Sequence, residues 1–166
     1  MDPTMTFSVA QAGGRLEDVA LLRGVGRFID DISLAGMLHV TVVRSTMAHA
    51  LIRGIDTAAA RQMPGVRAVL THDDLRPLLA GDRIALAMPS AAIRFTVDPP
   101  MLASTETCYV GEPIALVVAE SRCLAEDAAA LVEIELEPLP AVVDIEVGLA
   151  PGAPKVRLDC PDNLVA

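Results

Sequence analysis

The most regular pattern of apolar and polar positions lies between residues 109 and 140. Ile114 to Ala119 is an unbroken apolar run of strand length, rich in β-branched residues, which predicts a strand that needs cover on both faces. Ser121 is suited to cap a helix after it, because its hydroxyl can accept a hydrogen bond from a free amide of the first turn. The apolar positions that then recur at helical spacing are Leu124, Ala128, Leu131 and Val132.

The period changes to two after this helix, which predicts a half-buried strand that ends at Pro138. Apolar residues at 132, 134 and 136 alternate there with glutamates, so one face of the strand is acidic. We expect the apolar side chains of this strand–helix–strand unit to be largely buried and the glutamates to be exposed. The two sets are Val117, Leu124, Ala128, Leu131 and Ile134 on one side, and Glu133, Glu135 and Glu137 on the other.

Three further elements are predicted upstream, and they must supply the layer that buries this unit. Met37–Arg44 alternates as a strand, residues 58–63 favour a short helix that Pro64 and Gly65 end, and residues 66–70 alternate again. Residues 81–107 carry three prolines and no sustained period, so they predict irregular structure.

Residues 109–144 read YVGEPIALVVAESRCLAEDAAALVEIELEPLPAVVD and resemble a segment of the molybdenum hydroxylases, the group of xanthine dehydrogenase, aldehyde oxidase and aerobic carbon monoxide dehydrogenase. Arg23–Ser45 and Ala48–Leu75 are similar to the same family, in the same order. The resemblance implies the α/β-hammerhead domain that opens the molybdopterin-binding subunit. The expected fold class is α+β, with a mixed β-sheet and a few packed helices.

The expected organisation has three parts. Residues 1–14 are small and polar and are expected to form a flexible tail. Residues 15–146 would form the hammerhead domain. Residues 147–166 contain three prolines and two glycines and are expected to be a linker. In the resembling proteins a similar stretch continues into the molybdopterin-binding domain, which is absent from this sequence.

Composition narrows the function classes. The formal net charge is −9, with 13 basic and 22 acidic residues, which disfavours nucleic-acid binding because phosphates are neutralised by clustered Lys and Arg. Apolar residues make up 52% of the chain, yet no run approaches the roughly 18 residues of a membrane span. The apolar surplus indicates a surface that meets another domain or subunit, or else simply an alanine-rich composition.

The cysteines and the N-terminus indicate a cytoplasmic protein. Cys108, Cys123 and Cys160 are odd in number and widely spaced, which is typical of free thiols in a reducing compartment. The first residues show neither the basic region nor the apolar region of a secretion signal.

No cofactor-binding residue is predicted in this chain. The spacing of the three cysteines does not match the C-x4-C-x2-C pattern of a plant-type [2Fe–2S] cluster. By resemblance, the complete enzyme would carry molybdopterin, [2Fe–2S] clusters and FAD on other domains or subunits. The family's catalytic glutamate and molybdopterin contacts lie beyond its hammerhead domain. We therefore assign no catalytic, cofactor-binding or metal-binding residue.

A few residues nevertheless carry chemistry worth following. His39, His49 and His72 lack the close spacing of zinc ligands, and His49 is interpreted as a structural, hydrogen-bonded residue. Cys123 paired with a histidine is an alternative that would make the chain a small hydrolase. Glu112, in the turn before the apolar strand, is expected to accept hydrogen bonds from turn amides.

The function that follows is architectural. The chain is interpreted as the N-terminal hammerhead module of a molybdopterin-containing oxidoreductase, which packs against the molybdopterin-binding domain and the iron–sulfur subunit and is inactive alone. The alternative, from another class, is a free-standing adaptor subunit without redox function. Neither interpretation specifies a substrate.

Overall fold

The computed structural model describes residues 15, 17–86, 90–95 and 97–166. The chain divides into two compact units, one up to Met37 and the other from Leu38 onward. The expected tail, residues 1–14, lies outside the described residues. The first unit contains α1 (Asp18–Leu22) and the single 3-10 turn η2 (Ile29–Asp31), and neither of them has a buried residue.

The second unit contains two three-stranded antiparallel sheets. In the first sheet β5 (Pro113–Ala119) lies between β1 (His39–Arg44) and β3 (Val66–Thr71), so Leu116 pairs with Val42 on one side and Leu70 on the other. This central position explains why β5 is apolar on both faces: Ile114, Ala115, Val117 and Ala119 are all fully buried. The strand predicted from residues 114–119 is confirmed.

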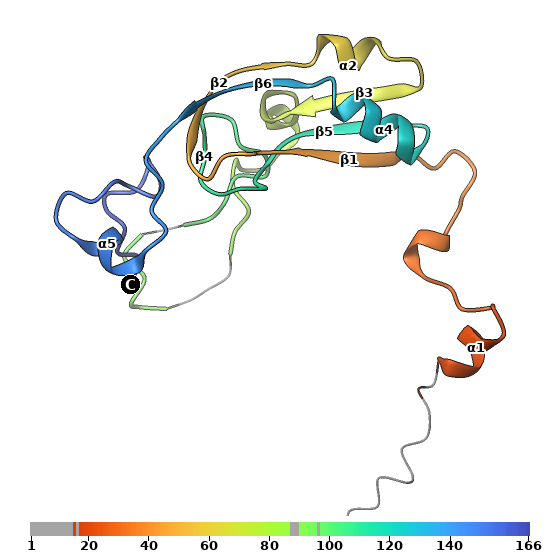
Figure 1. Cartoon of the computed structure of the whole chain (residues 1–166), viewed down its shortest axis with the longest axis horizontal. Coiled ribbons are helices and arrows are strands. Elements are labelled where there is room, and N and C mark those ends of the chain that lie inside the picture. The colour runs from red at the N-terminus through yellow and green to blue at the C-terminus, as the bar shows by residue number, and fades with distance from the viewer. Residues whose placement is uncertain (1–14, 16, 87–89, 96) are drawn as a thin grey trace, which may run out of the picture. The chain divides into compact units, whose positions relative to one another are not determined.

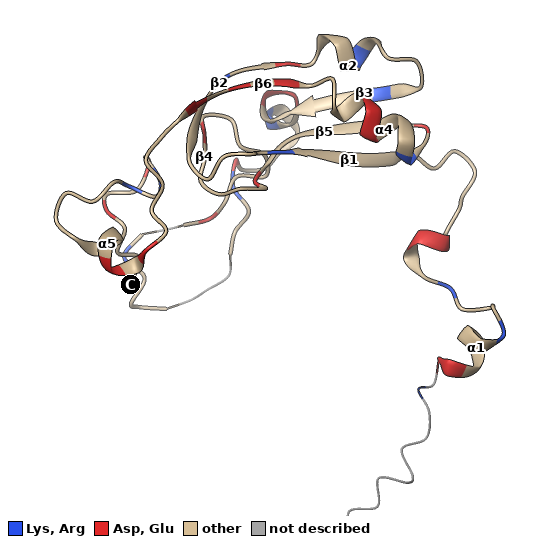
Figure 2. Ribbon diagram, viewed as in Figure 1, with Lys and Arg blue, Asp and Glu red and all other residues tan. Residues whose placement is uncertain are grey.

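In the second sheet β2 (Ala50–Asp56) lies between β4 (Glu106–Thr107) and β6 (Glu133–Pro138). The glutamates of β6 are exposed and the apolar residues between them are partly buried, as the alternation predicted. Figure 2 shows the resulting acidic stretch on this strand. Because β5 and β6 belong to different sheets, the predicted strand–helix–strand unit connects the two sheets and does not form a parallel pair.

Two helices cover the first sheet. The helix α4 (Arg122–Ala129) packs against β1 and β5, and α2 (Ala58–Gln62) packs against β3 (Figure 1). Ser121 caps α4 as predicted, because its hydroxyl accepts a hydrogen bond from the Leu124 amide at 3.3 Å. The core between these helices and the sheet contains Ala60, Val69, Val117 and Ala128.

The predicted burial of Leu131 is wrong. The helix ends at Ala129, before the last two apolar positions of the predicted helical period, and Leu131 lies in the turn before β6 with 43% of its surface exposed. Ala125 occupies the buried helical position that the sequence prediction omitted. Leu124 and Ile134 are partly buried, while Val117 and Ala128 are fully buried as predicted.

The remaining elements are short. The single-turn helix α3 (His72–Leu75) and the 3-10 turn η3 (Arg76–Leu78) follow β3, and α5 (Ile145–Leu149) follows β6. Residues 147–166, expected to be a linker, make many hydrogen bonds. Asn163, for example, donates to the carbonyls of Gly148 and Pro154 at 2.8 Å each. These contacts give the segment a defined path.

Candidate functional site

A cavity of about 550 Å3 lies between residues 156–157 and the irregular residues before β4. Arg83 and Arg157 line it together with Glu106 and Glu112, and His72 contributes from α3. No single element supplies these side chains. They converge because residues 156–157 return to the turn between β4 and β5.

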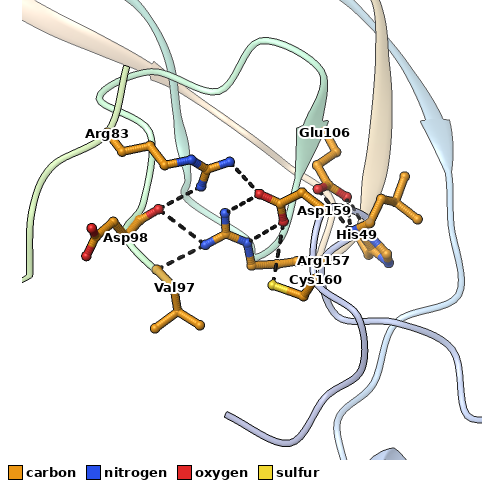
Figure 3. Close-up of polar contacts among 9 residues, drawn as sticks. His49, Arg83, Val97, Asp98, Glu106, Arg157, Asp159 and Cys160 are labelled. Atoms are coloured by element: carbon orange, nitrogen blue, oxygen red, sulfur yellow. Dashed lines mark hydrogen bonds and ion pairs between the residues drawn. The ribbon is translucent and has the colours of Figure 1, made fainter. Parts of the chain in front are cut away.

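Arg157 is the centre of the polar contacts beside this cavity (Figure 3). Its guanidinium donates to both carboxylate oxygens of Asp159, at 3.1 and 2.9 Å, and to the carbonyl of Val97 at 3.0 Å. Arg83 also donates to Asp159 and, at 2.7 Å, to the carbonyl of Asp98. The hydrogen bond from Arg157 holds the pKa of the Asp159 carboxyl below its usual range. Both arginines are thus paired within the chain.

Glu112 is almost fully buried, with 3% of its surface exposed. Its carboxylate accepts a hydrogen bond from the Cys108 amide, so the expected turn contact is confirmed. Burial raises the pKa of Glu112, and the amide hydrogen bond only partly offsets that effect. The arrangement stabilises the turn around Gly111, whose φ of +91° suits a glycine.

The cysteines are poor candidates for nucleophiles. Burial, together with the nearby Glu106 and Glu112, raises the pKa of the Cys108 thiol to about 12, so the reactive thiolate is scarce at neutral pH. Burial also raises the pKa of Cys160. Cys123 is exposed on α4, and in the described part of the chain it has no hydrogen bond to a histidine. The structure therefore gives no support to a Cys–His hydrolase.

The three histidines lie apart in the fold. His39 begins β1, and His72 begins α3 with its Nδ1 3.7 Å from Asp73. His49 lies just before β2 and is buried, with hydrogen bonds through both ring nitrogens. The hydrogen bonds expected for this residue are thus present, and its structural role stays an interpretation. Within residues 15, 17–86, 90–95 and 97–166, no three His, Cys, Asp or Glu side chains gather as metal ligands would.

Sequence reasoning missed the Arg83–Arg157–Asp159 cluster. Its members come from two stretches interpreted as irregular or linker, and no spacing rule brings residues 83 and 157 together. The only signal was local, because Arg157 and Asp159 are two positions apart in a proline-rich segment. Among the described residues no helix is both long enough and apolar enough to cross a membrane.

The chain passes repeatedly between two small antiparallel sheets, and the helices α2 and α4 lie in two of these connections. Residues 23–140 match the family model described as "Aldehyde oxidase and xanthine dehydrogenase, a/b hammerhead domain". The chain belongs to this family.

Named relatives agree with this assignment. Over 150 residues the chain is 45% identical to the large subunit of nicotine 6-hydroxylase from Paenarthrobacter nicotinovorans. It is 41% identical to the large chain of carbon monoxide dehydrogenase from Afipia carboxidovorans, again over 150 residues. Each alignment covers 90% of this chain and 18% of the relative. The chain therefore spans about 18% of the length of these curated relatives.

Solved structures agree as well. Quinoline 2-oxidoreductase from Pseudomonas putida 86 superposes with a TM-score of 0.83 at 43% identity, over 93% of this chain and 19% of that one. The aldehyde oxidoreductase of Desulfovibrio gigas superposes with a TM-score of 0.78 at 34% identity, over 89% of this chain and 16% of that one. The expected family and the α+β hammerhead class are confirmed.

Proposed function

We propose that this chain is the packing module of a molybdenum-containing hydroxylase, in which it supports the domain that holds the molybdopterin. The family match over residues 23–140 carries the proposal, since its relatives are large subunits of oxidoreductases. The partners would be the molybdopterin-binding domain or subunit and the iron–sulfur subunit. Within the described residues, the polar clusters of the chain are paired with one another and not arranged for catalysis. Its own role is therefore to present a folded surface to its partners.

Exposed apolar side chains support a packing role. In the first unit they lie in α1 and η2, where Leu22 and Ile29 are 88% and 87% exposed. In the second unit they follow β6, where Val143 and Ile145 are 93% and 82% exposed. Side chains of this size are stabilised by removal from water, so both stretches suit burial against another domain.

The cofactors of the proposed enzyme would be bound elsewhere. Molybdopterin, [2Fe–2S] clusters and FAD would lie on other domains or subunits, and residues 1–166 would bind none of them. Purified 166-residue protein should then be colourless. Elemental analysis that finds near-stoichiometric molybdenum or iron in washed protein would contradict this part of the proposal.

The proposal also includes domain limits and a location. Residues 15–146 would be the hammerhead domain, with residues 1–14 as a tail and residues 147–166 leading toward the molybdopterin-binding domain. A cytoplasmic location is supported by the three free cysteines, because a reducing compartment keeps thiols from forming disulfides.

Co-expression tests the function. Residues 1–166 are produced with the molybdopterin-binding portion of a large subunit from the same genome, and the mixture is analysed by size-exclusion chromatography and a dye-coupled oxidation assay. Co-elution and restored activity are expected, while the chain alone should oxidise no aldehyde, purine or carbon monoxide. If the molybdenum-bearing portion is fully active alone and never co-elutes, the free-standing adaptor function replaces this proposal.

A matched pair of variants tests the surface. Ile145→Asp places a charge in the first turn of α5, at an exposed apolar site, and should weaken co-elution. Ala59→Asp places the same charge in the first turn of α2, at an exposed site away from that stretch, and should leave co-elution unchanged. If the two variants co-elute equally well, α5 is not part of the contact surface.

A further inference from the structure

His49 connects the end of β6 to the rest of the domain. Its backbone carbonyl accepts a hydrogen bond from the Leu139 amide at 2.9 Å, and its Nδ1 lies 2.9 Å from the carbonyl oxygen of Pro140. Pro140 is the last residue of the family match, so this contact is made at the end of the matched region. The imidazole is buried, with 6% of the residue exposed.

The other side of the imidazole faces Glu106 of β4. Nε2 of His49 lies 3.3 Å from the Oε2 of Glu106 (Figure 3). Both oxygens of that carboxylate also lie 3.1 Å from the Leu158 amide. Glu106 therefore joins β4 to the returning segment around Leu158, and His49 joins Glu106 to the chain after β6.

A neutral imidazole and an ionised carboxylate together carry one proton too few to form both hydrogen bonds of the His49 ring. A backbone carbonyl can only accept, and an ionised carboxylate can only accept, so both ring nitrogens of His49 face acceptors. A neutral imidazole has one N–H and can satisfy one of the two. Both contacts form only when the pair carries the additional proton, on the imidazole or shared with Glu106.

We propose that His49 and Glu106 form a proton-dependent clamp that fixes the path of residues 140–158 as the chain leaves the hammerhead domain. With the proton bound, His49 contacts both the Pro140 carbonyl and the Glu106 carboxylate, which accepts from the Leu158 amide. Without it, the imidazole keeps either Pro140 or Glu106, because its one N–H can face only one acceptor. The direction in which the following chain leaves then depends on pH.

The charges around the clamp are mixed. Glu106 shares its cavity with Asp82, Arg83, Glu112 and Arg157, and with His72. Cys108 and Tyr109 line a smaller cavity of about 200 Å3 beside His49. Arg83 and Arg157 are both bonded to Asp159, which leaves Glu106 as the acidic group in hydrogen-bond contact with the imidazole.

The variant Glu106→Gln tests whether the contacts of His49 need the additional proton. The Gln oxygen can still accept from the Leu158 amide, while its NH2 group can donate to Nε2 of a neutral imidazole. This variant should therefore keep the clamp closed without the additional proton. His49→Gln removes the imidazole, and His39→Gln, on β1, is the matched control for the loss of a histidine elsewhere.

The test uses NMR of the 166-residue chain from pH 5 to 9. In the wild type we expect both ring nitrogens of His49 to be protonated at the acidic end. The Leu139 amide donates to the His49 carbonyl and the Leu158 amide donates to Glu106, so they report on the two sides of the clamp. Because a neutral His49 keeps only one of its two side-chain partners, amide exchange at Leu139 or at Leu158 should accelerate about tenfold or more on raising the pH, after correction for intrinsic pH dependence and by comparison with Val117 in the core. His39→Gln should behave as the wild type.

The variants decide the outcome. Glu106→Gln should show slow exchange at both Leu139 and Leu158, with no pH dependence beyond that of Val117, and His49→Gln should show fast exchange at one or both throughout the range. A singly protonated His49 ring at pH 5 would overturn the proposal. So would wild-type and Glu106→Gln proteins with the same pH dependence at both amides.

Discussion

The buried carboxylate of Glu112 accepts a hydrogen bond from the backbone amide of Cys108 across the Gly111 turn. This contact holds the loop that joins β4 to β5, the central strand of the first sheet. Burial disfavours the charge of Glu112 more than the amide favours it, so the pKa of this carboxyl is raised.

The first prediction concerns pH and stability. Because folding raises the pKa of Glu112, the folded chain binds this proton more tightly than the unfolded chain does. The resulting stability is present below pH 4.5, the ordinary glutamate value, and is lost as the pH rises through the folded pKa. In Glu112→Gln, whose amide oxygen can still accept from Cys108, this loss should be absent.

Urea unfolding of both proteins from pH 4 to 8 measures the effect. The free energy of unfolding of the wild type minus that of the variant should fall with rising pH. The subtraction matters because Asp74 and Asp159, whose pKa values are lowered, contribute with the opposite sign in both proteins. A difference that is constant with pH would contradict the prediction.

The second prediction concerns thiol reactivity. Cys108 should resist alkylation at pH 8, since burial and two nearby carboxylates raise its pKa to about 12. Cys123 is exposed on α4 and should react first. Iodoacetamide labelling of native protein, followed by peptide mass spectrometry, gives the order. Modification of Cys108 at the rate of Cys123 would mean that the loop opens readily.

The third prediction compares two leucines. Leu102 is 2% exposed, so Leu102→Ala should reduce the free energy of unfolding by roughly 2–5 kcal/mol. Leu131 is 43% exposed, so Leu131→Ala should cost about 1 kcal/mol or less. Denaturant unfolding of the two variants in parallel provides the comparison, and equal losses would place Leu131 in the core after all.

The fourth prediction concerns Gly65, which lies in the turn between α2 and β3 with a φ of +87°. A Cβ at this position would lie 2.8 Å from Cδ1 of Leu124 on α4. Gly65→Ala should therefore lower stability by at least about 1–2 kcal/mol, the cost of the left-handed conformation alone. Gly81→Ala is the matched control, because its Cβ would meet nothing within 4 Å and its φ is not positive. Similar melting temperatures for the two variants would count against the contact.

The fold was predictable where a single period persisted. β6 alternates with a period of two and α4 keeps a helical period, while β5 is an unbroken apolar run, and the burial of each element follows its pattern. β2 was not predicted as a strand, because Arg53 and Gly54 interrupt its apolar positions at a shift in register between Ile52 and Gly54. Leu131 was misassigned because an apolar period does not mark the residue at which a helix ends.

The polar clusters were less predictable for a different reason. The local contact of Glu112 with its own turn followed from the neighbouring residues. The contacts of His49 with Glu106, and of Arg83 with Asp159, join residues far apart in sequence. Such pairs depend on the final path of the chain, and a single sequence carries no periodicity that encodes them.

The strand order has a consequence for how the chain folds during synthesis. β1 and β3 both pair with β5, and β2 pairs with β4 and β6, so none of the strands in the described residues pairs with its immediate neighbour in sequence. β1 and β3 leave the ribosome without a partner until residues 113–119 follow them, and β2 has none until residues 106–107 follow. Sheets closed by such distant segments form slowly. Nascent chains that pause before residue 113 expose unpaired apolar strands, and they should be the species that chaperones capture.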